Sequence, residues 1–254
     1  MQSYLLTIAY DGSAYAGWQR QDGFDTVQQK LEDAFQILVG EPITVHGAGR
    51  TDAGVHAIRQ GAHARLPRHW SPENLLCALN GNLPRDIAVS LVREVPASFH
   101  ARFSARGKRY FYRFVVSEVR PVLALGYCHW VRRPLDVMAM REAAHQLVGR
   151  HDFASFASNP GYSRKRGTVR RIDHLPVVRR PFGVDIVVQG EGFLYNMVRA
   201  IAGTLRDVGF GKYPPVHVGE ILRARDRRLA GATMEPSGLY LLRVLYPPDV
   251  LKPL

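Results

Sequence analysis

The sequence has few of the features that mark secreted, membrane-spanning or zinc-binding proteins. Its 254 residues include only two cysteines, Cys77 and Cys128, which lie far apart and fit no zinc-binding spacing. Two isolated thiols favour a reducing compartment, so we expect a cytoplasmic protein. No apolar run reaches the roughly 18 residues that a spanning helix needs, so no membrane role is expected. The opening residues 1–8 lack a basic segment and a cleavage site, and they predict a strand instead of a signal peptide.

Motifs for metal and cofactor chemistry are also missing. We find no H-E-x-x-H, no G-x-S-x-G and no phosphate-binding P-loop. Residues 47–52 match part of the G-x-G-x-x-G dinucleotide fingerprint, but Asp52 stands where the third glycine should be. The residues that follow, through Gln60, predict no amphipathic helix on which a pyrophosphate could bind. The sequence therefore predicts neither a metal nor an organic cofactor.

Acidic residues are scarce relative to basic ones. The chain has 34 Lys and Arg against 22 Asp and Glu, a formal net charge of +12. This balance predicts attraction to a polyanion, with nucleic acid the first candidate and an anionic membrane surface the second. Several loops carry basic runs, at residues 164–166, 170–171, 179–180 and 223–228. Such runs are often simply solvated, but together with the net charge they indicate an extended surface for phosphates.

The first hundred residues predict the order β-α-β-β-α-β. The expected strands cover residues 4–10, 43–46, 60–66 and 87–92, and the expected helices cover residues 26–39 and a short segment after Ser71-Pro72. Asp25 is the expected cap of the first helix and Gly40 its end. This order is the split-βαβ pattern of ferredoxin-like RNA-binding domains.

The second half predicts a looser copy of the same pattern. The expected strands cover residues 108–116, 184–189 and 239–245, and the expected helices begin after Asp136 and cover residues 195–208 and 217–225. With 46% hydrophobic residues the chain can form one large domain or two coupled halves. We divide it into a half over residues 1–104 and a half over residues 105–254.

The loop Gly49-Arg50-Thr51-Asp52-Ala53-Gly54 places one acid and one base between glycines. Glycines on both sides allow unusual backbone angles and the close approach of a ligand. Asp52 could act as a nucleophile, a general base or an electrostatic stabiliser. The alternative is a turn aspartate that binds nearby amides, which is the commoner role of an Asp in a Gly-rich loop.

Two further residues have both a functional and a structural interpretation. Tyr110 lies among alternating cations and aromatics in residues 106–113, which suits base stacking and phosphate binding, but it could equally face the core. Arg199 borders the apolar stripe of the predicted 195–208 helix. There it could pair with a carboxylate, or extend its charged end into solvent.

Several motifs in the same order resemble the TruA family of tRNA pseudouridine synthases. The main one is Gly47-Ala48-Gly49-Arg50-Thr51-Asp52-Ala53-Gly54-Val55-His56-Ala57. The supporting motifs are Tyr10-Asp11-Gly12, Gly17–Gln21, Ala78–Asn80, Phe99–Ala105, Lys108–Tyr112, His151–Phe156, Gly192–Arg199 and Gly238–Leu241. The resemblance covers almost the whole chain, and Thr233–Pro236 departs from the pattern.

The resemblance implies an α+β pseudouridine synthase fold. Two ferredoxin-like halves would form a mostly antiparallel sheet flanked by helices, with the active cleft between them. The implied substrate is uridine at positions 38, 39 and 40 in the anticodon stem-loop of tRNA. A homodimer that needs no cofactor and has no role with DNA is also implied.

The resemblance also assigns roles to individual residues. It implies that Asp52 is the catalytic aspartate, that Tyr110 stacks on the target base and that Arg199 pairs with Asp52. It links Arg50 to base flipping, and it places a leucine, Leu239 or Leu241, in the pocket. Two other classes stay open: a non-catalytic RNA-binding protein or RNA chaperone, which would not explain an acid beside phosphates, and a nucleotide-dependent oxidoreductase.

Overall fold

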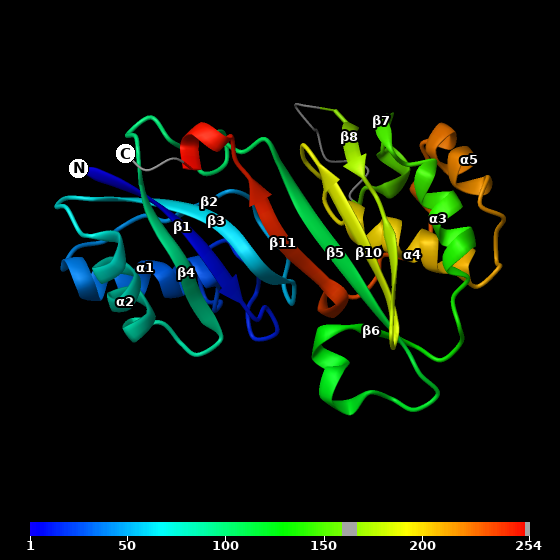
Figure 1. The fold of residues 1–254 in the computed structure, drawn as a ribbon, viewed down its shortest axis with the longest axis horizontal. Helices are drawn as coiled ribbons and strands as arrows, with labels where there is room; N and C mark the ends of the chain where they lie inside the picture. The colour runs from blue at the N-terminus through cyan, green and yellow to red at the C-terminus, as the bar shows by residue number, and fades with distance from the viewer. Residues whose placement is uncertain (159–166, 252–254) are drawn as a thin grey trace. The chain divides into compact units, whose positions relative to one another are not determined.

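The computed structural model of the chain describes residues 1–158 and 167–251. The basic run at residues 164–166 therefore lies outside the described residues. The chain divides into two compact units, Met1–Arg106 with Tyr240–Leu254, and Gly107–Leu239. Each unit combines a sheet with helices (Figure 1). The sequence division placed all of residues 105–254 together, whereas the structure groups the residues from Tyr240 onward with the first unit.

The first unit follows the order β-α-β-β-α-β before the chain returns with a last strand. Its elements are β1 (Gln2–Tyr10), α1 (Val27–Val39), β2 (His46–Gly47), β3 (His56–Leu66), α2 (Pro72–Asn82), β4 (Ile87–Val95) and β11 (Leu239–Leu245), whose first residue belongs to the second unit. The strands lie in the order β4-β1-β3-β11, with β2 beside β3. All pairs are antiparallel except β3 with β11, which is parallel. The order predicted for the first hundred residues is confirmed.

The helix ends of the first unit follow local chemistry. The Ser71 side chain accepts a hydrogen bond from Asn74 N at the start of α2, and Pro72 occupies the first turn, as predicted. Gly40 ends α1 in the left-handed conformation with φ of 84°. The predicted cap of α1 is wrong by one residue, because the side chain of Thr26, and not that of Asp25, accepts from Gln29 N.

A buried cluster marks one end of the first unit. It joins β1, the loop after β2 and the segment after β4 through Leu5, Ala48, Val95, Phe99 and Ala101. The partly buried residues Val244, Tyr246 and Val250 pack against it. The last strand therefore completes the apolar core of the unit in which the chain began.

Within residues 107–158 and 167–238, the second unit contains six strands and three α-helices. They are β5 (Gly107–Val116), β6 (His129–Val131), α3 (Val137–His145), β7 (Gly149–Asp152), β8 (Val169–His174), β9 (Val177–Arg180), β10 (Gly183–Gly190), α4 (Met197–Gly209) and α5 (His217–Ala224). The strand order is β5-β10-β8-β7, with β6 beside β5 and β9 beside β10. Asp136 caps α3 by accepting from Met138 N and Ala139 N, as predicted.

The core of the second unit lies between its sheet and its helices. Ile186 and Val188 of β10 are fully buried, and so are Ile201 and Leu205 of α4. Helix α4 packs against β5 and α3, and α3 also contacts α5 and β9. Among residues 1–158 and 167–251, no helix is long and apolar enough to cross a membrane.

Candidate active-site residues

Asp52 lies in the short connection between two antiparallel strands of the first unit. β2 pairs with β3 through His46 with His63 and Gly47 with Ala62, and the loop with Asp52 joins these strands. Within the loop, Val55 N donates to Asp52 O at 3.2 Å, which closes a tight turn. Asp52 is partly exposed, whereas Thr51 and Val55 on either side are buried. The backbone on both sides of the carboxylate is therefore anchored in the unit.

A second loop of the same unit, residues 10–18, holds the Asp52 loop. Gly12 N donates to His56 Nδ1 at 3.1 Å, Gly54 N donates to Tyr15 O at 3.3 Å, and Trp18 N donates to Thr51 O at 3.1 Å. These three hydrogen bonds involve residues 51, 54 and 56, which lie on both sides of Asp52 in the sequence. Because backbone groups make or receive all of them, they fix the path of the chain and leave the carboxylate to other partners.

Two glycines allow this close approach. A Cβ atom at Gly12 would lie 2.1 Å from Val55 O, and one at Gly17 would lie 2.6 Å from Thr51 O. Gly17 also has a φ of 103°, which residues with a side chain rarely adopt. Both positions therefore require glycine, and the fit between the two loops depends on them.

Buried side chains of β1 and β3 also form hydrogen bonds with the Asp52 loop. The hydroxyls of Tyr10 and Thr51 lie 2.8 Å apart, and Gln60 Nε2 donates to Gly49 O at 3.0 Å. Burial raises the pKa of Tyr10, while the hydrogen bonds with Thr51 and Gln60 act in the opposite direction. The phenol is therefore a neutral hydrogen-bonding group at physiological pH.

His56 connects three segments at the end of the loop. Its Nδ1 atom lies 3.1 Å from Asp11 Oδ1 as well as accepting from Gly12 N, and its ring stacks on Tyr240 of β11 at a centroid distance of 4.8 Å. Motif matching drew attention to Tyr10, Gly12 and His56, but it assigned them no role. Their shared role in fixing the Asp52 loop is a contact between distant segments, which spacing along the chain does not show.

Arg50 and Leu241, two other candidates, lie in the same unit as Asp52. Arg50 is exposed, and its Nε donates to Gln19 Oε1 at 3.2 Å. Leu241 is fully buried on β11, in register with Ala57 of β3. Ala57 follows the Asp52 loop directly, so Leu241 lies on the strand next to that loop.

Tyr110, on β5, belongs to the second unit. It is opposite Val188 of β10, and its ring meets Phe193 edge-on at a centroid distance of 5.2 Å. The neighbouring Tyr112 is fully buried and its hydroxyl donates to Glu235 O at 2.9 Å, so Tyr112 has a structural role in the core. Tyr110 keeps a small exposed fraction of 8%.

The cations that alternate with these aromatics have structural partners. Arg113 donates through Nε and Nη2 to the two carboxylate oxygens of the buried Asp185, each at 2.9 Å. Arg109 donates through Nε and Nη2 to Gln189 Oε1. Both arginines therefore tie β5 to β10, in addition to any part they take in binding RNA.

Arg199 lies in the first turn of α4, and two of its contacts are with neutral groups. Its Nε donates to Met234 O at 2.6 Å and its Nη1 donates to Asn196 Oδ1 at 2.8 Å. Asn196, the residue before the helix, has the left-handed φ of 59°. A carbonyl and an amide orient the guanidinium without neutralising its charge. Leu239, the last candidate, is 6% exposed at the start of β11.

The candidates thus form two groups, each within one unit. Arg50, Asp52 and Leu241 belong to the first unit, and Tyr110, Arg199 and Leu239 belong to the second. Within residues 1–158 and 167–251, no group of three or more His, Cys, Asp or Glu could hold a metal ion. The chemistry available at these positions is that of a carboxylate, two guanidinium groups, a phenol and apolar side chains.

Comparison with known proteins shows where this set of residues belongs. A family model described as tRNA pseudouridine synthase matches residues 6–104 and 143–247. A tRNA pseudouridine synthase A of Allorhizobium ampelinum is 44% identical over 98% of this chain and 96% of its own length. The protein of the same name from a Thermoanaerobacter species is 40% identical over 97% of this chain and its own full length.

A solved structure, entitled a Cbf5-Nop10-Gar1 complex, contains a chain that aligns with 93% of this one, at 11% identity and a TM-score of 0.34. That likeness is too low to carry an argument. The family match and the full-length relatives confirm the resemblance found in the motifs, and they bear out the enzyme class over a non-catalytic RNA-binding protein. The chain belongs to the tRNA pseudouridine synthase family.

Proposed function

We propose that this tRNA pseudouridine synthase isomerises uridine at positions 38, 39 and 40 of the anticodon stem-loop, and that Asp52 is its catalytic carboxylate. The observation that carries the proposal is the anchoring of the Asp52 loop. A second loop and a buried hydroxyl pair fix the backbone on both sides of a partly exposed acid. A turn aspartate with only a local role would need no such support.

The reaction needs only acid-base or nucleophilic chemistry from the protein. The N1–C1′ bond of uridine breaks, the base turns, and a C5–C1′ bond forms while the C5 proton leaves. N1, which has lost its bond to C1′, takes up a proton in place of the one that C5 releases, so atoms and electrons balance and the product is an isomer. Asp52 would either attack C1′ or remove the C2′ proton to give a glycal, and both routes require the ionised carboxylate.

We propose Arg199 as the cation that keeps Asp52 ionised during the reaction. An arginine close to a carboxylate stabilises its charged form, against the effect of burial. The support is chemical: the Arg199 guanidinium is oriented by Met234 O and Asn196 Oδ1, which are neutral. Those two contacts fix the position of the guanidinium at the start of α4.

The remaining candidates would handle the base. A nucleotide in the anticodon arm is stacked, so it must be turned out before its sugar can react. We propose that Arg50 assists this step and that the Tyr110 ring stacks on the released uracil, an interaction worth about 1–3 kcal/mol per base. Leu239 and Leu241 are the proposed apolar walls of the pocket.

The assembly and location are also proposed. A homodimer in the cytoplasm agrees with the family resemblance and with two cysteines that form no disulfide. Light scattering on the purified protein tests the assembly, and a mass of one chain at micromolar concentration would exclude the dimer.

Asp52→Asn tests the catalytic assignment. We expect turnover to be abolished and tRNA affinity to stay nearly unchanged, because the amide keeps the shape but cannot act as nucleophile or base. The measurement is tritium release from tRNA labelled at uridine C5, with EDTA in a parallel reaction, and mapping of the modified positions. Asp33→Asn, an exposed acid on α1, is the matched control and should behave as wild type. Near-normal turnover in Asp52→Asn would falsify the assignment.

A further inference from the structure

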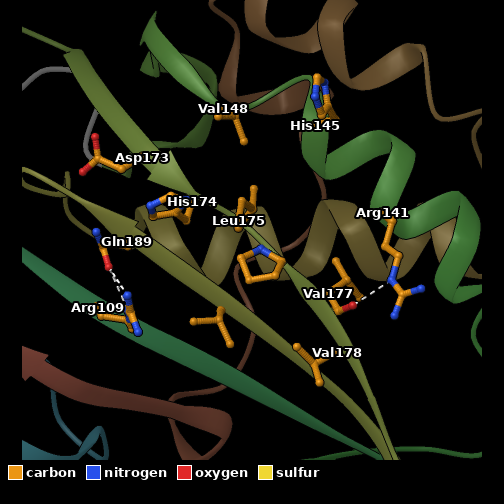
Figure 2. Close-up of a pocket in the computed structure, with 12 residues that line it drawn as sticks. Arg109, Arg141, His145, Val148, Asp173, His174, Leu175, Val177, Val178 and Gln189 are labelled. Atoms are coloured by element: carbon orange, nitrogen blue, oxygen red, sulfur yellow. Dashed lines mark hydrogen bonds between the residues drawn. The ribbon is translucent and has the colours of Figure 1, made fainter.

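The second unit contains a groove beside helix α3, at the junction of β8 and β9 (Figure 2). Its volume of about 770 Å³ is within the range of ligand pockets and large enough for a nucleotide. Residues of five elements, β5, α3, β8, β9 and β10, and of their loops line it: Arg109, Arg141, His145, Val148, Asp173–Val178, Val187 and Gln189. None of these residues belongs to the proposed catalytic set.

A proline at the edge of the sheet helps to explain the groove. β8 and β9 both pair with β10, and Leu175-Pro176 lies between them. Pro176 O accepts from Val187 N at 2.9 Å, but a proline has no N–H of its own, so the ladder is interrupted there. β9 lies beside α3, and the side chain of Arg141 on α3 binds the backbone of β9 at Val177 O.

Cationic and imidazole side chains form one side of the groove. Arg141 Nε donates to Val177 O at 2.9 Å, which holds the guanidinium at the rim, and an arginine has four more N–H donors. His145, one turn further along α3, and His174, at the end of β8, are exposed in the same groove. The one acid of the lining, Asp173, has an ion pair with Arg171 at 2.9 Å, which compensates its charge.

The floor of the groove is apolar. It is made of Val148, Leu175, Val177, Val178 and Val187. Apolar side chains suit the face of a nucleobase, and a guanidinium beside them suits a phosphate. A purely apolar ligand would leave the arginine and histidines without a role, and a double helix would present phosphates but no exposed base face.

We propose that this groove binds an unpaired nucleotide of tRNA other than the one being isomerised, with its phosphate at Arg141 and its base against the valines. The proposal rests on tRNA being the substrate. It gives the enzyme a contact for recognising tRNA that is separate from the chemistry. Loss of the groove should therefore weaken binding and leave the isomerisation step intact.

The first test removes the polar rim with the double variant Arg141→Gln and His145→Gln. We expect the Kd for tRNA to rise about 3–10-fold at fixed salt, while kcat at saturating tRNA stays within about twofold of wild type. The slope of log K against log salt should fall in magnitude by about 0.7, the value for one phosphate on a single strand. Arg150→Gln removes an exposed cation of the same unit that does not line the groove, and it is the matched control.

Unchanged affinity in the double variant, or an equal loss in Arg150→Gln, would overturn the proposal. Since Arg141 also binds a backbone carbonyl, the thermal unfolding of each variant must match wild type. If it does not, the second test decides. Val178→Cys, made in a Cys77→Ser background, carries a photoactivated thiol reagent on the floor of the groove. The other cysteine, Cys128, is buried.

Crosslinking to tRNA at a reproducible unpaired nucleotide is the expected result of the second test. Crosslinks that scatter along the tRNA, or that join a second copy of the protein, would contradict the proposal. The experiments distinguish a failure of the groove proposal from a failure of the proposed function. If the groove variants bind tRNA normally while Asp52→Asn still abolishes tritium release, the groove proposal is wrong and the proposed function stands.

Discussion

At the scale of single residues, the surroundings of Asp52 are set by residues about forty positions earlier in the chain. Gly12 and Gly17 let one loop contact another at distances that no side chain would permit, and Tyr10 supplies a buried hydroxyl to Thr51. A carboxylate on a fixed backbone needs little reorganisation before it reacts, which is a general requirement of active sites. The glycine-flanked loop is thus held by hydrogen bonds on both sides of Asp52, which its composition alone does not predict.

Replacing Arg199 tests the proposed cation. Arg199→Leu should lower kcat/KM at least about 100-fold, a typical result of losing a partly buried charge partner. Without the cation a carboxylate protonates more readily, so the acidic limb of the pH–rate profile should move to higher pH. Arg223→Leu, an exposed arginine on α5, is the control and should keep the wild-type profile. A wild-type pH profile in Arg199→Leu would count against the pairing.

His63, a buried histidine of the first unit, should make stability depend on pH. Burial first, and then the charges of His100, His46 and Arg65, together lower the pKa of His63 to about 4. In the unfolded chain a histidine has a pKa of about 6.5. Between these values the unfolded state binds a proton that the folded state does not, so stability is present above pH 6.5 and is lost as the pH falls.

Between pH 7.5 and pH 5.5 the free energy of unfolding should fall by on the order of 1 kcal/mol, which corresponds to a few degrees in Tm. Thermal unfolding of wild type and His63→Gln over this range measures it, since the glutamine removes the titration. The Tm of His63→Gln should change less with pH than that of wild type. His145→Gln, at an exposed position, is the control and should show the wild-type dependence. Parallel curves for wild type and His63→Gln would exclude this histidine as the source.

At the scale of elements, local chemistry predicted helix ends wherever tertiary contacts did not compete. Asp136 caps α3 as predicted, and α2 follows Ser71 with Pro72 in its first turn, as predicted. At α1 the N–H groups of Val27 and Gln28 donate to Gly17 O and Trp18 O instead, at 3.2 and 3.0 Å. These two hydrogen bonds with a distant loop fix the backbone at the start of α1, so Thr26 becomes the N-cap.

The strand predicted at residues 43–46 is largely replaced by side-chain contacts. Only His46 and the following Gly47 form β2. Val45 N donates to Glu32 Oε1 at 3.0 Å, and Val45 O accepts from Gln28 Nε2 at 3.1 Å. Two buried polar side chains of α1 therefore take the backbone groups that a neighbouring strand would have bound, and alternation along the sequence could not reveal this.

Helix α4 provides a prediction about packing. A Cβ atom at Gly203 would lie 1.9 Å from Ala232 O, because the segment before β11 crosses the helix there. Gly203→Ala should therefore lower the free energy of unfolding by about 1–3 kcal/mol, measured by thermal or urea unfolding. Gly81→Ala in α2 meets no atom within 4 Å and is the control. It should be neutral or stabilising, because alanine is the better helix former. If the two variants are equally stable, the segment that crosses α4 can move away from the added methyl group with little loss in the free energy of unfolding.

At the scale of the whole molecule, charge is the property with the clearest consequence. A net charge of +12 predicts tRNA binding that depends strongly on counterion release. If 6–10 phosphates are contacted, the affinity should fall about 10³–10⁵-fold between 50 and 200 mM salt. Filter binding across this range measures the slope. A change of less than tenfold would mean that few of the basic residues contact the tRNA.

The sequence by itself determined the element order of the first unit, most helix ends, the charge and, through its motifs, the family. These follow from interactions within a few residues of each other, or from residue types that spacing reveals. Only the tertiary structure decided that β11 lies beside β3 in the first unit, that residues 10–18 hold the Asp52 loop, and that a groove opens at Pro176. Each of these depends on contacts between segments far apart in the chain, where the free energy of packing, and not local preference, selects the partner.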